Sequence, residues 1–124
     1  MDPRIVRTYK ASGAIANRRL VKFGASDGVV SQASAATDAI IGVVDYPNGC
    51  ADGEVVDVVL FGPADVDAGG TIARGVRITA DANGKAVAAA PATGVNNPTA
   101  GIILVSAVSG DIAPAFVQPS QVQG

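Results

Sequence analysis

Residues 53–87 have the sequence GEVVDVVLFGPADVDAGGTIARGVRITADANGKAV, and the apolar run near its start decides the fold. Val55 to Phe61 is rich in β-branched side chains and is bounded by Gly53 and by Gly62-Pro63. A short apolar run with such boundaries favours a largely buried β-strand over a helix. It is the most hydrophobic strand candidate in the chain, and we expect the other strands to be arranged around it.

Hairpins are predicted on both sides of this central strand. Downstream, residues 76–79 alternate in polarity, and Asn83-Gly84 favours a type I′ turn that pairs residues 86–89 back onto them. Upstream, residues 20–23 and 29–32 are two short strand candidates around a glycine-containing turn. The apolar residues of these segments therefore follow the spacing of strands and turns, and not the longer spacing of a helix.

An internal repeat is indicated by four motifs that return in the same order later in the chain. Gly13-x-Ile15, Asp27-Gly28, Ile41-Gly42-Val43 and Gly53-Glu54-Val55 recur as Gly70-x-Ile72, Asn83-Gly84, Ala100-Gly101-Ile102 and Gly110-Asp111-Ile112, at offsets of 57, 56, 59 and 57 residues. Recurrence at one period favours a duplicated unit. We predict an all-β fold, a small compact barrel or sandwich of two pseudo-repeated hairpin-plus-strand units, residues 13–62 and 70–117.

The 124 residues are predicted to form one β domain, residues 13–117, with extensions at both ends. Residues 1–12 form an extended N-terminal arm in this prediction, because Ile5 to Lys10 alternates like a strand but has no companion turn. Residues 118–124 are polar and are predicted to be a flexible C-terminal tail.

The amino-acid composition indicates a thin hydrophobic core. The chain has no Trp, three Phe and two Tyr, while Ala, Val, Ile and Gly dominate. Small side chains fill narrow barrels or thin sandwiches, so we expect oligomerisation or docking on a larger surface to add stability.

Charge is distributed unevenly along the chain. Asp2 is the only acidic residue among the first 26, which carry six basic ones: Arg4, Arg7, Lys10, Arg18, Arg19 and Lys22. Residues 27–124 hold three basic and ten acidic side chains. Either the basic residues form a solvated face, or they form an arm that meets an acidic neighbour such as another copy of the chain. Nucleic acid is a poor third choice, because no stacking aromatic side chains accompany the basic cluster.

No constellation of residues predicts catalysis. The chain has no His and one Cys, which rules out Ser-His-Asp and Cys-His devices, histidine zinc sites and cysteine-rich clusters. Cys50 is interpreted as an incidental thiol, and Asp81-x-Asn83-Gly84 lacks the acidic residue that ends a calcium loop. We therefore expect no enzyme activity, no metal and no cofactor. The N-terminus has no apolar leader segment, so we expect cytoplasmic synthesis without membrane association.

A succession of strand and turn motifs covers nearly the whole chain. They are VKFG (21–24), AIIGV (39–43), VDVVLFG (56–62), AGGTI (68–72), TADANGKAV (79–87) and GDIAP (110–114). In this order they resemble the small capsid decoration, or cement, proteins of tailed bacteriophages. The resemblance implies a β-rich protein that is made in the bacterial host cytoplasm, docks as homotrimers on the outer surface of an assembled head and stabilises the shell. Its implied partners are the major capsid protein and its own copies, with no nucleic acid, membrane, small-molecule substrate or catalytic residues.

The N-terminal segment supplies the candidate contact residues. The hypothesis is that the following side chains meet the capsid or a neighbouring subunit by adding a strand to an exposed sheet edge: Arg4, Ile5, Val6, Arg7 and Lys10. Two alternatives remain open. A phage tail or adhesion module that binds glycans requires an aromatic-lined face, and a lipoyl- or biotinyl-type carrier domain requires modification at Lys85 beside the Asn83-Gly84 turn.

Overall fold

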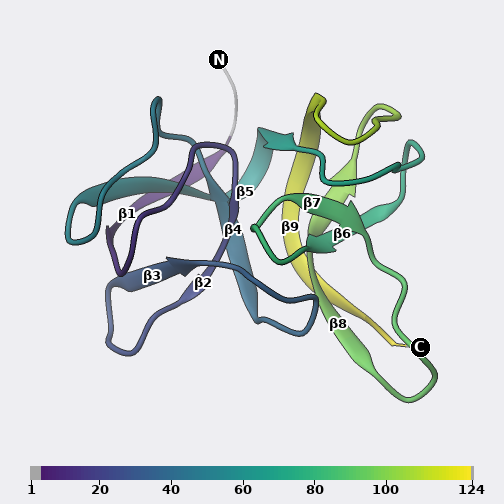
Figure 1. The fold of residues 1–124 in the computed structure, drawn as a ribbon, viewed down its shortest axis with the longest axis horizontal. Helices are drawn as coiled ribbons and strands as arrows, with labels where there is room; N and C mark the ends of the chain where they lie inside the picture. The colour runs from purple at the N-terminus through teal and green to yellow at the C-terminus, as the bar shows by residue number, and fades with distance from the viewer. Residues whose placement is uncertain (1–3, 124) are drawn as a thin grey trace.

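The computed structural model describes residues 4–123, which form nine β-strands in one continuous sheet and contain no helix (Figure 1). The strands are β1 (Ile5–Ala11), β2 (Leu20–Phe23), β3 (Val29–Gln32), β4 (Ile40–Val44), β5 (Val55–Asp67), β6 (Arg77–Ala80), β7 (Ala86–Ala88), β8 (Asn96–Ile103) and β9 (Ile112–Gln123). The predicted all-β class is confirmed. Accordingly, this part of the chain has no helix able to cross a membrane.

The first half of the chain closes into a five-stranded barrel. Its strand order is β1-β3-β2-β4-β5, and β1 pairs with β5 to complete the ring. The predicted hairpin between β2 and β3 forms, with Lys22 opposite Ser31. The closing β1–β5 pairs are antiparallel, whereas β1 and β3 run parallel through Lys10 and Val29.

The second half repeats this pairing pattern, and the second part of β5 takes the place that β1 has in the first half. Its strands follow the order β5-β9-β8-β6-β7, and a parallel bridge between Ala68 and Ala86 joins the end of β5 to β7. This parallel bridge corresponds to the parallel pairing between β1 and β3 in the first unit. Figure 1 shows the first unit on the left, the second on the right, and β4 and β5 between them.

Strand β5 belongs to both units, and it is longer than predicted. Its first part, Val55 to Phe61, pairs with β1, and its second part, Gly62 to Asp67, pairs with β9. The expected end of the strand at Gly62-Pro63 is wrong. Gly62 has φ of 113°, a conformation open to glycine, so the strand can turn from one unit into the other without ending.

Two glycines at corresponding places allow neighbouring strands to approach closely. A Cβ atom added to Gly42 in β4 would lie 2.2 Å from the carbonyl oxygen of Val59, and one added to Gly101 in β8 would lie 1.9 Å from that of Phe116. Both distances are far below van der Waals contact. Only a residue without a side chain fits these positions, which explains why the Ile-Gly-Val and Ala-Gly-Ile motifs share their glycine.

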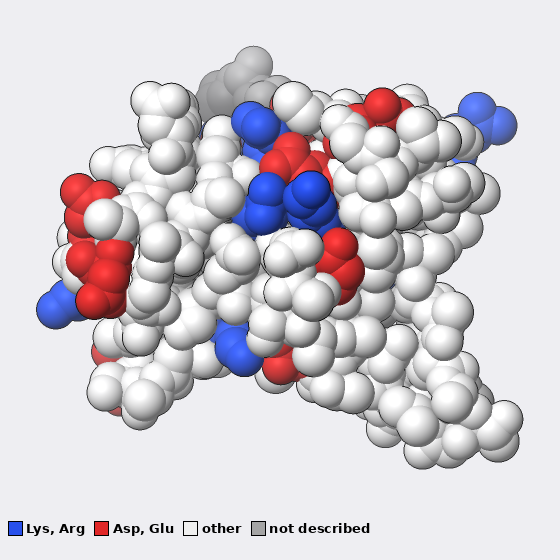
Figure 2. Space-filling view, viewed as in Figure 1, with Lys and Arg blue, Asp and Glu red and all other residues white. Residues whose placement is uncertain are grey.

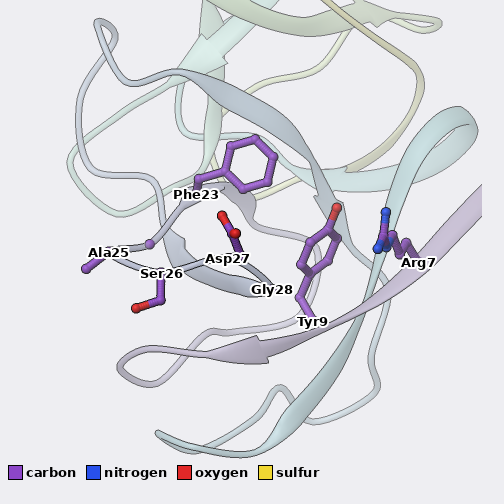
Figure 3. Close-up of a pocket in the computed structure, with 8 residues that line it drawn as sticks. Arg7, Tyr9, Phe23, Ala25, Ser26, Asp27 and Gly28 are labelled. Atoms are coloured by element: carbon purple, nitrogen blue, oxygen red, sulfur yellow. The ribbon is translucent and has the colours of Figure 1, made fainter.

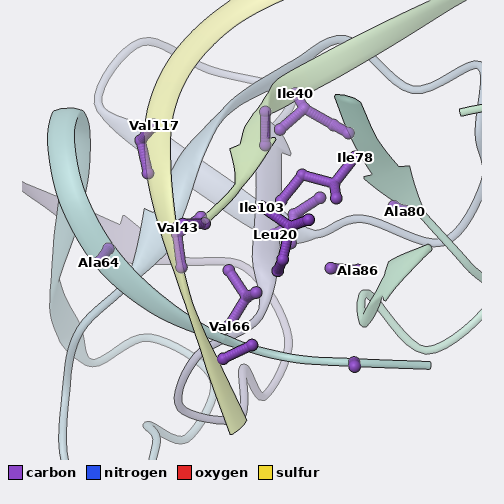
Figure 4. Packing of buried hydrophobic residues seen from close by; sticks show 14 of the residues in the cluster. Leu20, Ile40, Val43, Ala64, Val66, Ile78, Ala80, Ala86, Ile103 and Val117 are labelled. Atoms are coloured by element: carbon purple, nitrogen blue, oxygen red, sulfur yellow. The ribbon is translucent and has the colours of Figure 1, made fainter. Parts of the chain in front are cut away.

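The buried residues form two clusters. The first barrel is filled by side chains that include Tyr9, Ile15, Val21 and Val58. The second cluster fills the second unit and extends over the outer face of the first, with these labelled members in Figure 4: Leu20, Ile40, Val43, Ala64, Val66, Ile78, Ala80, Ala86, Ile103 and Val117. The second cluster contains residues of both units and therefore holds the two units together.

The N-terminal segment is extended as predicted, but its independence from the domain is wrong. Residues 5–11 form β1, which pairs with β5 from Ile5 to Lys10 and with β3 at Lys10 and Ala11. Sequence alternation indicated a strand, but the partner lies about 50 residues away in the chain, so no local turn signals it. The part of the predicted arm at residues 1–3 lies outside the described residues.

The predicted flexible tail is also wrong over the part that the structure describes. Strand β9 continues to Gln123, and its residues 120–123 pair with residues 96–99 of β8. The same pairing places residues 96–98 in strand β8, with Pro98 opposite Gln121. Backbone hydrogen bonding to β8 orders a segment whose side chains alone give little reason for order. Gly124 lies outside the described residues.

Ion pairs tie basic residues of the first unit to acidic residues elsewhere in the chain. Arg18 Nε lies 2.8 Å from Asp67 Oδ1, and Arg19 Nε lies 3.2 Å from Asp67 Oδ2. Arg19 also donates through Nη1 to the carbonyl oxygen of Asn83, at 2.8 Å. Figure 2, which has the same view as Figure 1, shows positive and negative side chains intermixed near the middle of the face that it draws. For these arginines the acidic neighbour is in the same chain, not in another copy.

Asp38 forms a second charged cluster with Lys22, whose Nζ lies 3.3 Å from its carboxylate. Burial acts to raise the pKa of Asp38, but hydrogen bonds from the backbone N–H groups of Ser34 and Ala35, together with Lys22, outweigh it, and the pKa is lowered. A carboxylate with a lowered folded-state pKa contributes stability above its unfolded pKa, about 3.9, and loses it as the pH falls through the folded value.

We expect Asp38→Asn to cost about 1 kcal/mol of unfolding free energy at pH 7 and to lose less stability than the wild type between pH 5 and pH 2. Urea unfolding at a series of pH values measures both effects. Asp27→Asn is the control, because Asp27 is exposed and has no ion-pair partner within residues 4–123. Equal acid sensitivity of Asp38→Asn and the wild type would contradict this role of Asp38.

Candidate functional site

Four of the five contact residues predicted from the sequence lie on β1, the fifth directly precedes it, and all five are exposed. Arg4, just before the strand, forms an ion pair with Asp45 at 2.7 Å. The Arg7 guanidinium lies 5.8 Å from the centre of the Tyr9 ring. The four residues on the strand alternate between its two faces; the full set is Arg4, Ile5, Val6, Arg7 and Lys10. The structure therefore does not bring the five side chains together on one surface.

Apolar residues lie opposite one another across β1, β5, β9 and β8. Pairing across the sheet places Ile5 opposite Phe61, and both Pro63 and Ile102 opposite Phe116. Directly opposed residues in paired strands point to the same face. Pro114 lies two residues before Phe116 on β9 and therefore on the same face. We call the surface that these side chains form the apolar strip: Ile5, Phe61, Pro63, Ile102, Pro114 and Phe116.

The two phenylalanines form the centre of the apolar strip. The ring centres of Phe61 and Phe116 are 5.2 Å apart with an interplanar angle of 83°, an edge-to-face arrangement that aromatic pairs favour. Phe61 is 40% exposed and Ile5 is 60% exposed. Neighbouring apolar side chains that remain accessible are typical of interaction surfaces. Among the strip residues, only Ile5 was identified from the sequence, because the others become neighbours through pairing of distant strands.

A pocket of about 430 Å³ opens beside the first barrel. It is lined by Arg7, Tyr9, Phe23 and the turn from Gly24 to Gly28 (Figure 3). Tyr9 and Phe23 are 6.3 Å apart with an interplanar angle of 71°, and Phe23 is 57% exposed whereas Tyr9 is almost buried. The pocket thus combines an exposed aromatic ring with the charges of Arg7 and Asp27.

This pocket has the size and mixed lining that suit a small polar molecule with an apolar face. Phe23 gives it one exposed aromatic ring, whereas the glycan-binding alternative requires an aromatic-lined face and Tyr9 is buried. The sequence does not predict this pocket, because Tyr9 and Phe23 lie on different strands and no local motif relates them.

The remaining candidate residues have structural roles. Burial is the main cause that raises the pKa of the Cys50 thiol, which disfavours the reactive thiolate. The Asp81 carboxylate accepts hydrogen bonds from the backbone N–H groups of Asn83 and Lys85, so it closes the turn before β7. That turn is longer than the two-residue type I′ turn predicted. Within residues 4–123 no three His, Cys, Asp or Glu side chains gather where a metal ion could bind.

Comparison with known proteins finds a likeness in fold. No known family matches the sequence, and no curated protein matches it. Among solved structures, the chain is similar to the N base of the head fiber gp8.5 of bacteriophage phi29, with a TM-score of 0.66 and 18% sequence identity. The alignment covers 97% of this chain and 98% of that one. At this identity the likeness establishes the fold, over the full length of both chains.

Proposed function

We propose that this protein is a structural component of a bacteriophage virion that binds the outer surface of the assembled head as trimers and stabilises the shell. The observation that carries the proposal is the full-length fold likeness to a protein described as part of a phage head fiber. The order of sequence motifs, which resembles phage decoration proteins, points to the same class independently. In this role the protein has no catalytic activity, and its partners are the capsid protein and its own copies.

The exposed side of β1 is proposed to face the shell. Val6 and Lys10 lie on this strand, and Lys10 is exposed without an ion-pair partner within the described part of the chain. Arg7 carries a second positive charge on the other face of the strand, at the rim of the pocket. Positive side chains on a surface strand attract a carboxylate-bearing partner and speed its encounter, an effect that salt screens.

We expect Lys10→Glu to weaken binding to undecorated heads by about tenfold at low salt and by less at moderate salt. The heads come from the phage that encodes the chain, produced without this gene, and bound protein is counted after sedimentation and located by electron microscopy. Arg74→Glu is the matched control, because Arg74 is also exposed but lies in the second unit. If the wild type fails to bind these heads, the proposed function is wrong. If both variants lose affinity equally, only the role of β1 is wrong.

A further inference from the structure

The two units differ in how much of an equivalent surface is covered. On the outer face of the first unit, Leu20 lies opposite Val43, and Val43 lies opposite Val59. All three side chains are fully buried, because the second unit packs over them and they belong to its core. In the first unit, this face is therefore an interface.

The second unit has the same three positions on β6, β8 and β9. Arg77 lies opposite Ile102, and Ile102 lies opposite Phe116, which repeats the pairing of the first unit. Here Arg77 is exposed, and Ile102 and Phe116 are only half-buried. Phe61 packs against Phe116 and widens the apolar area. The apolar strip therefore includes two of the three positions, Ile102 and Phe116, whose equivalents in the first unit are buried against the second unit.

We propose that the apolar strip is the contact between copies of this chain. The number of copies, three, rests on the proposed function, but the choice of surface does not. No charged side chain belongs to the strip, so copies that meet there bring no like charges together. An edge-to-face aromatic pair at the centre of such a surface is typical of the residues that dominate binding energy.

Charges at the two borders of the strip fit a cyclic arrangement. Arg77 lies beside Ile102 at the β6 border, and Asp65 lies beside Pro114 at the β5 border. Both are exposed, and neither has an ion-pair partner within residues 4–123. In a ring of identical copies, one border of each strip meets the opposite border of the next. Arg77 of one copy then faces Asp65 of its neighbour at the polar rim of the contact.

The inference is tested by measuring mass in solution, by light scattering after size exclusion across a concentration series. The wild type is expected to be a trimer, and Phe61→Lys is expected to need at least tenfold higher concentration to associate. Phe23→Lys is the matched control, since it makes the same change at an exposed phenylalanine outside the strip and should remain trimeric. Circular dichroism establishes that each variant is folded. If Phe61→Lys does not fold, Ile5→Lys replaces it, because Ile5 is the more exposed strip residue.

Exchange of the border charges adds a second measurement. Asp65→Arg should weaken association, and combination with Arg77→Asp should restore it. Folded Phe61→Lys or Ile5→Lys that remains as trimeric as the wild type would overturn the strip as the contact and leave trimeric binding to heads intact. A wild type that stays monomeric over the whole concentration range would also overturn it. Binding to undecorated heads would still decide the proposed function separately.

Discussion

Gly101→Ala is expected to remove most of the stability of the fold. The added Cβ would lie 1.9 Å from the carbonyl oxygen of Phe116 and 2.9 Å from the backbone nitrogen of Gln118. Both neighbours are backbone atoms of β9, which cannot move aside without breaking pairs of the β8–β9 ladder. Overpacking typically costs about 1–3 kcal/mol, and the strained φ of +149° adds to it, for an expected loss of about 3–5 kcal/mol. Small domains have about 5–15 kcal/mol in total.

Urea unfolding and thermal melting measure this loss, and two alanine variants separate its causes. Gly94 has φ of +80° and nothing within 4 Å of an added Cβ, so Gly94→Ala reports backbone strain alone. Gly42 lacks a positive φ but has Val59 oxygen at 2.2 Å, so Gly42→Ala reports the steric clash alone. We expect Gly42→Ala to fall nearer to Gly101→Ala. A Gly101→Ala protein no less stable than Gly94→Ala would show that β8 and β9 are not this close.

Asp67→Ala is expected to lower the unfolding free energy by about 2–3 kcal/mol, the second largest effect among our predictions. Asp67 receives hydrogen bonds from Arg18 and Arg19 at the junction between the two units, and its side chain is only 17% exposed. Without it, two partly buried guanidinium groups lose their counter-charge. Removing one member of a buried ion pair costs more free energy of unfolding than the intact pair contributes, because the remaining charge is left without a partner.

Chemical denaturation of Asp67→Ala, with Asp27→Ala as the control, tests this role. Asp27 is an exposed turn residue, and its replacement should change stability by less than about 0.5 kcal/mol. Arg18→Ala in the Asp67→Ala background should cost less than in the wild type, because the partner is already absent. Additive losses in this double-mutant cycle would mean that Arg18 and Asp67 do not interact in solution.

The strands of both hairpins could be predicted because the signals that specify them are local. β2 and β3 are short apolar segments on either side of a glycine turn, and β6 and β7 have the same arrangement. The central strand from Val55 was recognisable from its β-branched run, although its continuation through Gly62 was not. Local patterns report which segments prefer extended structure, and they report it without reference to their partners.

The candidate site was predictable only in part. Exposure of the β1 residues followed from their mixed polarity, and Ile5 is a member of the apolar strip. Phe61 belongs to a run that the sequence predicts to be largely buried, yet it is exposed because β5 passes from one unit to the other at the next residue. The pairing of Phe61 with Phe116 joins residues from the two halves of the chain, and no local pattern relates them.

By itself, the sequence determined that the chain is all-β, where its two hairpins lie, and which glycines recur at a period near 57 residues. Tertiary structure alone decided that β1 closes the first barrel, that β9 runs to Gln123, and that Asp67 neutralises two arginines. The physical reason is that side-chain alternation and turn chemistry act over a few residues. Strand order, burial and ion pairing arise only when segments separated by some 50 residues share backbone hydrogen bonds and a common core.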